Sequence, residues 1–145
     1  MTSPLHIVRT FLFSGALLSL GAAAFSAEPS LYERLGGEKA ITRIVDETID
    51  KTATDPATIR AFDKVNLAKL KLKIVEHFCA LTHGPCKYTG DTMAVSHKGL
   101  DITEAEFYGM VQNLRDVLDN MGAAESAKND LLKLLAPMKR DIVAR

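Results

Sequence analysis

The stretch that decides the fold is Asp91-Thr92-Met93-Ala94-Val95-Ser96-His97-Lys98-Gly99-Leu100, which presents one histidine between a loop and a long helix. The loop, residues 83–90, contains glycine and proline, and the helix that follows is capped and amphipathic. A short helical piece is predicted over 93–98, ending at Gly99, because glycine readily adopts the left-handed conformation found at helix ends. The stretch therefore predicts a helical domain in which His97 lies opposite an apolar helix.

Upstream of this stretch, every strong periodicity is helical. Ser30-Leu31-Tyr32-Glu33 is a capping box that starts a short helix, and Gly36-Gly37 end it. A second helix is predicted from about 38 until Asp55-Pro56 break it. A third begins after the N-cap Asn66 and runs over 67–81.

Downstream, Thr103-Glu104-Ala105-Glu106 is a second capping box, and the helix after it continues to Met121. The last helix is predicted over 125–143, with a kink at Pro137. The chain after residue 27 shows no alternation of period two. We therefore expect an all-α domain with about four substantial helices and several short ones.

A histidine presented opposite an apolar helix suits one axial bond to an iron porphyrin. The bound imidazole must be neutral, and its second ring nitrogen needs an acceptor, for which a backbone carbonyl near Met93 is well placed. The alternative is a surface histidine ahead of a Lys-Gly helix end. No Cys-x-x-Cys-His motif for covalent haem attachment occurs.

Length and charge limit the function classes. The chain has 145 residues, which suits one domain with one core. Its 18 basic and 18 acidic side chains balance, so net charge indicates no basic face for nucleic acid.

Residues 1–26 have the layout of a secretory signal peptide, with an apolar run over 11–20 and small residues over 21–27. Cleavage after Ser26, favoured over cleavage after Ala24, leaves a domain of residues 27–145. A membrane anchor is the alternative, although the apolar run is shorter than the about 20 residues of a span. We expect a periplasmic or otherwise exported protein, which contacts the membrane only through an uncleaved signal segment.

The two cysteines, Cys79 and Cys86, are candidates for one disulfide because export implies an oxidising compartment. The loop that they would close is short, so the bond would add about 2–3 kcal/mol at most. Two reduced thiols are the alternative.

The order of helices and loops resembles the truncated haemoglobins, specifically the first group of that family. The resemblance covers Ser30 to about Val143 and rests on an ordered set of residues. These are Leu31-Tyr32-Glu33-Arg34-Leu35-Gly36-Gly37, Phe62, Gly84-Pro85, Tyr88-Thr89-Gly90, Met93, His97, Gly99-Leu100, Ile102-Thr103, Phe107 and Leu135-Ala136-Pro137. The resemblance implies a two-over-two α-helical sandwich around one haem b.

Matched position by position, His97 takes the place of the proximal histidine that binds the haem iron, and Phe62 that of a phenylalanine packed on the porphyrin. Further matching positions line the haem cavity, namely Leu70, Lys73, Ile74, His77, Phe78, Tyr88, Met93, Ile102, Phe107, Leu114 and Leu118.

The distal side departs from the family pattern. Members of this group often place a tyrosine on the second helix, where this chain has Ile49, with Thr48 just before it. They often place glutamine on the next helix, where this chain has Leu70 and Ile74. These differences remove the usual hydrogen-bond donors to dioxygen, so we expect weaker retention of dioxygen, with NO and CO less affected.

Lys73 matches a position from which some relatives bind the iron on the distal side, so it is a candidate sixth ligand. Its alternatives are a solvated lysine or a partner of a haem propionate. His77 is a second candidate, although a cavity-lining histidine is favoured there. Either bond would suit electron transfer or ligand sensing better than gas storage.

The resulting expectation is an exported haem protein that binds diatomic gases or acts in redox or ligand sensing, with an electron-donor protein as an expected further partner. The first alternative is a haem enzyme, either a nitric oxide dioxygenase or one with peroxidase-like activity. The second is a helical module without haem, in which the histidines are structural.

Overall fold

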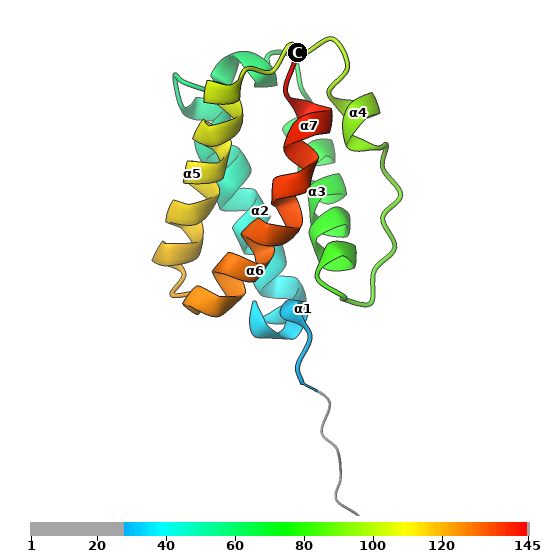
Figure 1. Ribbon diagram of the computed structural model, residues 1–145, viewed down its shortest axis with the longest axis vertical. Coiled ribbons are helices and arrows are strands. Elements are labelled where there is room, and N and C mark those ends of the chain that lie inside the picture. The colour runs from blue at the N-terminus through cyan, green and yellow to red at the C-terminus, as the bar shows by residue number, and fades with distance from the viewer. Residues whose placement is uncertain (1–27, 145) are drawn as a thin grey trace, which may run out of the picture.

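The computed structural model describes residues 28–144, and helices make up its framework (Figure 1). The expected signal peptide lies outside the described residues. In this part of the chain, no helix combines the length and the apolar character needed to cross a membrane. In chain order the elements are α1 (Leu31–Arg34), α2 (Gly37–Thr54), the 3-10 helix η1 (Ile59–Phe62), α3 (Leu67–Leu81), α4 (Met93–Ser96), α5 (Glu104–Asn120), α6 (Glu125–Leu135), the 3-10 helix η2 (Ala136–Met138) and α7 (Lys139–Ile142).

The helices begin where the sequence signals predict. Ser30 and Glu33 form the first capping box, in which the Ser30 amide donates to the Glu33 carboxylate at 2.8 Å. Thr103 and Glu106 form the second, at the start of α5. Asn66 caps α3 by accepting the Lys69 amide at 3.0 Å. These caps satisfy backbone donors that have no partner inside their helices.

The helices form two layers, α2 with α3 and α5 with the segment from α6 to α7 (Figure 1). Helix α2 packs against both α3 and α5, and α1 contacts α2 and α6. The apolar core lies between the layers and is formed by Leu31, Leu35, Ile41, Ile44, Val45, Ile49, Phe78, Leu114, Leu118, Ala127 and Leu131. The prediction of an all-α, two-over-two fold is confirmed.

Two elements differ in detail from the prediction. The last helix is interrupted by η2 rather than merely kinked, because Pro137 has no amide hydrogen to continue the α-helical pattern. The short piece that carries the histidine ends at Ser96, two residues earlier than predicted, which makes His97 its C-cap. The described residues also contain an isolated parallel bridge between Ile102 and Val143.

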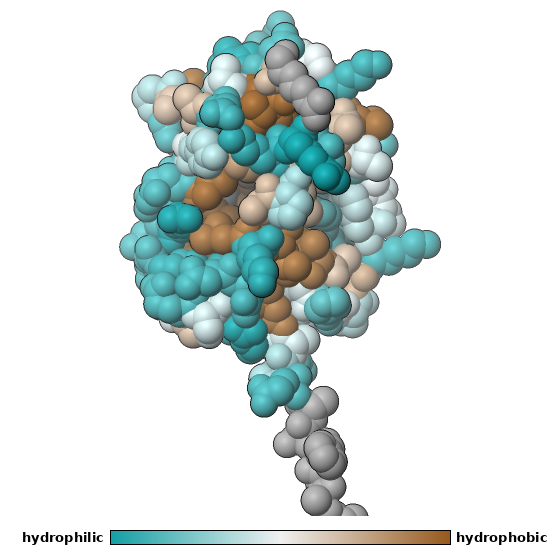
Figure 2. Space-filling view, in the orientation of Figure 1, coloured by the Kyte–Doolittle hydropathy of each residue, from teal (hydrophilic) through white to brown (hydrophobic). Residues whose placement is uncertain are grey.

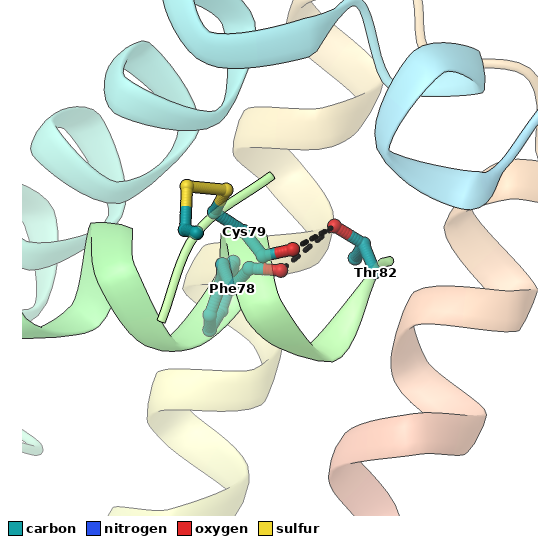
Figure 3. The surroundings of a disulfide bond; sticks show 4 residues. Phe78, Cys79 and Thr82 are labelled. Carbon is teal, nitrogen blue, oxygen red and sulfur yellow. Dashed lines mark hydrogen bonds between the residues drawn. A yellow bond between two sulfur atoms is a disulfide. The ribbon is translucent and has the colours of Figure 1, made fainter. Parts of the chain in front are cut away.

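The predicted disulfide between Cys79 and Cys86 is formed and ties the last turn of α3 to the following loop (Figure 3). The Thr82 hydroxyl donates to the Phe78 carbonyl at 2.7 Å and closes the end of the helix. Gly84 must be a glycine, because a Cβ there would lie 2.7 Å from the Cys79 sulfur. The disulfide therefore fixes the start of the loop that leads to His97.

Candidate functional site

A cavity of about 650 Å³ lies between the two helical layers and the segment that carries His97. Apolar side chains form most of its wall, and Figure 2 shows such side chains gathered around a hollow on one face of the molecule. Pockets of this size and character are typical sites for a small organic cofactor.

The structure brings nearly all of the predicted site residues to this cavity. Those in its wall are Phe62, Leu70, Lys73, Ile74, His77, Phe78, Tyr88, Met93, His97, Ile102, Phe107 and Leu114. Leu118 lies elsewhere, fully buried in the apolar core one turn further along α5.

His97 is oriented by the short helix that precedes it. Its Nδ1 lies 2.8 Å from the Met93 carbonyl oxygen, the acceptor expected from the sequence. Because a carbonyl can only accept, Nδ1 carries a proton, and Nε2 is the ring nitrogen left for a metal. His97 is half-buried in the cavity wall, so this imidazole has the tautomer that a metal ligand needs.

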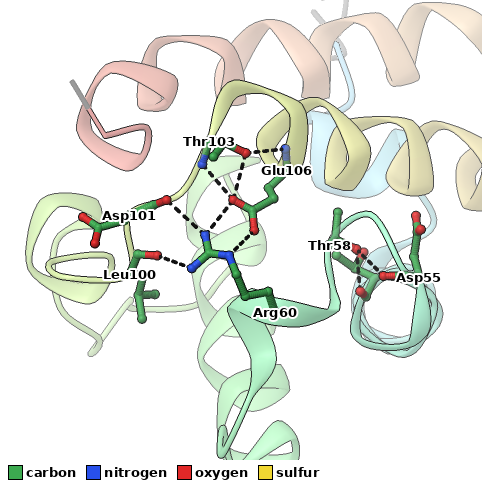
Figure 4. Close-up of polar contacts among 8 residues, drawn as sticks. Asp55, Thr58, Arg60, Leu100, Asp101, Thr103 and Glu106 are labelled. Atoms are coloured by element: carbon green, nitrogen blue, oxygen red, sulfur yellow. Dashed lines mark hydrogen bonds and ion pairs between the residues drawn. The ribbon is translucent and has the colours of Figure 1, made fainter.

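The turn after His97 is held by an arginine from another element (Figure 4). Arg60, on η1, donates to the carbonyl oxygens of Leu100 and Asp101, each at 3.0 Å. The same guanidinium makes two 2.7 Å bonds to the Glu106 carboxylate at the start of α5. Asp101 has a φ of 47°, a left-handed conformation that this contact helps to hold. We call this arrangement of Arg60, Glu106 and the two carbonyls the Arg60 clamp.

The contact between Arg60 and Glu106 shifts the pKa values of both side chains. The Arg60 guanidinium, helped by the Thr103 amide, lowers the pKa of Glu106 to about 2. Glu106 in turn raises the pKa of Arg60. Both groups are therefore charged at neutral pH, and they join the element that carries Phe62 to the segment that carries His97.

Part of the wall formed by α2 and α3 is apolar. Ile49, Leu70 and Ile74 line it at the positions where the family often has tyrosine or glutamine. The polar residues that α2 adds to this wall are Thr48 and Thr52.

The amine of Lys73 is engaged in other contacts. Its Nζ lies 2.9 and 3.0 Å from the Glu76 carboxylate oxygens and 2.6 Å from the Thr89 hydroxyl. The Thr89 hydroxyl, followed by Lys73, lowers the pKa of Glu76. Lys73 therefore lines the cavity while its ammonium is held by α3 and the loop before α4.

His77 lies in the cavity wall against Tyr88, with the ring centroids 4.8 Å apart. Burial lowers the pKa of His77, so the imidazole is neutral at pH 7. The Tyr88 hydroxyl donates to the Asp91 carbonyl at 2.7 Å and fixes the ring.

Sequence reasoning did not assign several cavity residues. The missed apolar ones include Val45, Met110, Val111, Leu135, Met138 and Ile142, and the missed polar ones include Thr52, Thr58 and Glu106. The helical periodicity of apolar residues in α5 and in the C-terminal segment could have predicted most of these apolar residues. No local pattern separates a cavity threonine from a threonine on a helix surface.

The donor set and the shape of the cavity fit a haem group. The His97 imidazole, held through Nδ1, leaves Nε2 to supply a single axial ligand, and apolar side chains such as Phe62 and Phe107 can pack on a porphyrin. Lys69, on α3, also lines the cavity. Lys71 is paired with Asp50 at 2.8 Å.

Comparison with known proteins agrees with this geometry. The profile of the family described as bacterial-like globin matches residues 30–144. A group 1 truncated haemoglobin of Mycolicibacterium paratuberculosis is 33% identical over 117 residues, which cover 80% of this chain and 86% of the relative.

Solved structures show the same fold. The crystal structure of the truncated haemoglobin of Tetrahymena pyriformis in its Fe(III) form has a TM-score of 0.77 at 24% identity, covering 81% of this chain and all of that one. The 2/2 haemoglobin of a Synechococcus species, with covalently attached haem, has a TM-score of 0.76 at 23% identity, with the same coverage. The chain therefore belongs to the bacterial-like globin family, as a group 1 truncated haemoglobin, and these are haem-binding proteins.

Proposed function

We propose that this protein binds haem b through His97 and holds diatomic gases in the apolar distal part of its cavity, with NO and CO retained better than O₂. The observation that carries the proposal is the His97 imidazole, whose Nδ1 is fixed 2.8 Å from the Met93 carbonyl so that Nε2 is left as a ligand. Haem, when bound, supplies an iron atom with a coordination position open to a gas molecule.

The preference among gases follows from the residues in the distal wall. Dioxygen gains charge on an iron centre and is retained by hydrogen-bond donors, which Ile49, Leu70 and Ile74 do not supply. A hydrogen bond to a charged acceptor is worth about 1.5–3 kcal/mol, so its loss weakens retention by roughly one to two orders of magnitude. The retention of CO and NO depends less on such hydrogen-bond donors.

Gas dissociation rates test this proposal. We expect the ferrous protein to bind CO and NO, and to release O₂ at least about tenfold faster than its Ile49→Tyr variant, which restores a donor. CO release should differ little between the two proteins. Equally slow O₂ release from both would overturn the apolar-pocket argument, and nitrate formation from NO over many turnovers would favour the nitric oxide dioxygenase alternative.

A second state of the iron centre, suited to redox chemistry or ligand sensing, would use Lys73 as a distal ligand. Lys73 lines the cavity, but its bonds to Glu76 and Thr89 must break, and its ammonium must lose a proton, before the nitrogen can bind a metal. We therefore expect a six-coordinate ferric spectrum that grows with pH. Lys73→Ala should remove it, and identical spectra of the two proteins at pH 9 would exclude this ligand.

Export completes the proposal. The Cys79–Cys86 disulfide supports it, since such bonds persist in oxidising compartments. Fractionation of cells that express the full chain should place a protein beginning near Ala27 in the exported fraction. A full-length protein recovered only from the reducing compartment would exclude export.

A further inference from the structure

One buried hydroxyl in the cavity wall has no partner. Thr48 is 3% exposed, and its Oγ1 is the one buried side-chain polar atom without a hydrogen-bond partner among the described residues. An unsatisfied buried polar group costs about 1–3 kcal/mol and calls for a specific explanation.

Three threonines in α2 or at the end of α3 satisfy their hydroxyls with backbone carbonyls. The hydroxyls of Thr52, Thr54 and Thr82 each donate to the carbonyl oxygen four residues earlier, at 2.6, 2.9 and 2.7 Å. This bond is the usual way for a threonine inside a helix to satisfy its hydroxyl. Thr48 does not make it, although it lies in the middle of α2.

Thr48 is also the residue of α2 that lines the cavity and carries a hydroxyl without a hydrogen-bond partner. The face of α2 that lines the cavity consists of Val45, Thr48, Ile49 and Thr52, spaced as one side of a helix. Thr52 gives its hydroxyl proton to the Thr48 carbonyl, and Thr58, also in the wall, donates to the Thr52 carbonyl at 2.6 Å. Ile49 has no donor.

We propose that the Thr48 hydroxyl is the hydrogen-bond donor to dioxygen in the distal cavity, in place of the tyrosine and glutamine that this chain lacks. The inference rests on the proposed function, because it assumes a gas bound on the distal side. A change of rotamer about the Cα–Cβ bond would bring the Thr48 hydroxyl to the place now held by its methyl group, while the methyl moves to that of the Cβ hydrogen, so no movement of the helix is needed. The Thr48 hydroxyl would then make up part of the O₂ retention that is lost with the missing tyrosine and glutamine, but not all of it.

Thr48→Val tests the proposal because valine keeps the shape and removes the donor. Loss of a hydrogen bond to a charged acceptor predicts that the O₂ dissociation rate constant rises by roughly one to two orders of magnitude, while that of CO changes by less than about twofold. Thr48→Ser keeps the hydroxyl and should keep the slow rate. Should valine disturb the haem, Thr48→Ala gives the same comparison with Thr48→Ser.

Protein stability provides a readout that does not depend on gas binding. If Thr48 has no partner in the gas-free protein, Thr48→Val should unfold at the same or a higher denaturant concentration. A clear loss of stability would show that Thr48 is structural and would overturn the proposal. Thr54→Val, on the exposed side of the same helix, is the matched control for valine in a helix.

The outcomes separate the inference from the function on which it rests. A Thr48→Val protein that binds haem and CO but releases O₂ at the wild-type rate overturns the role of Thr48 and leaves the proposed function in place. If His77→Phe, rather than Thr48→Val, speeds O₂ release, then His77 is the donor and the proposal is wrong. A wild-type protein that binds neither haem nor CO overturns both.

Discussion

Replacing Glu106 with glutamine removes the negative charge at the centre of the Arg60 clamp while keeping the shape of the side chain. In the native protein this carboxylate accepts two bonds from Arg60 at 2.7 Å and one from the Thr103 amide at 2.8 Å. The substitution therefore weakens the contact that holds the turn after His97.

The magnitude follows from the pKa of Glu106, which falls from 4.5 to about 2. A fall of this size in the pKa corresponds to about 3 kcal/mol of stabilisation of the folded protein by the ionised carboxylate. Glu106 is 11% exposed but Arg60 is 57% exposed, so solvent screens the pair and the effective contribution is smaller. We expect Glu106→Gln to lower the free energy of unfolding by about 1–2 kcal/mol at pH 7.

The sign of the pH dependence is fixed by the direction of the shift. Because folding lowers the pKa of Glu106, the stabilisation is complete above about pH 4.5 and is lost as the pH falls through about 2. The difference in unfolding free energy between wild type and Glu106→Gln should therefore shrink to roughly half at pH 3.

Urea unfolding of both proteins, each prepared in the same way at pH 7 and at pH 3, measures this difference. Glu47→Gln is the matched control, because Glu47 pairs with Arg43 in an exposed i,i+4 contact. It should lower stability by about 0.5 kcal/mol or less. The reasoning is refuted if the two variants lose the same stability at pH 7, or if the Glu106→Gln difference grows as the pH falls.

Three further predictions concern the rest of the fold. Replacing Cys79 and Cys86 with serine should lower the free energy of unfolding by about 2–3 kcal/mol in chemical denaturation, and no change would refute the stabilising role of the disulfide. Leu118→Ala, at 0% exposure, should lose about 2–5 kcal/mol, whereas Leu72→Ala, at 66% exposure, should lose far less in the same assay. Burial lowers the pKa of His77, so folding favours its neutral form and stability should fall as the pH drops below about 6.5. In melting curves recorded over a series of pH values, His77→Phe should reduce this dependence of stability on pH. An unchanged dependence would contradict the prediction.

Local signals predicted the helical fold because each depends on neighbouring residues. The capping boxes, the N-cap Asn66 and the break at Pro137 act within one or two helical turns. The disulfide was predictable because only two cysteines are present. His97 and its acceptor Met93 are four residues apart, so their contact too is visible in the sequence.

The features that escaped prediction join residues far apart in the chain. Arg60 meets Glu106 across 46 positions, and no pattern in the sequence indicates that pair. The lack of a partner for the Thr48 hydroxyl depends on how α2 packs, which its helical periodicity does not reveal. Lys73 was assigned to the cavity from its position, but its bond to Thr89 depends on the path of the loop.

The absorption spectrum of His97→Gly, with and without added imidazole, tests the central claim most directly. If His97 binds the haem iron, the variant should lose or grossly alter its Soret band, and imidazole should restore the wild-type spectrum. His83→Gly, at an exposed histidine, should leave the spectrum unchanged. An intact Soret band with unchanged coordination in His97→Gly would contradict the claim.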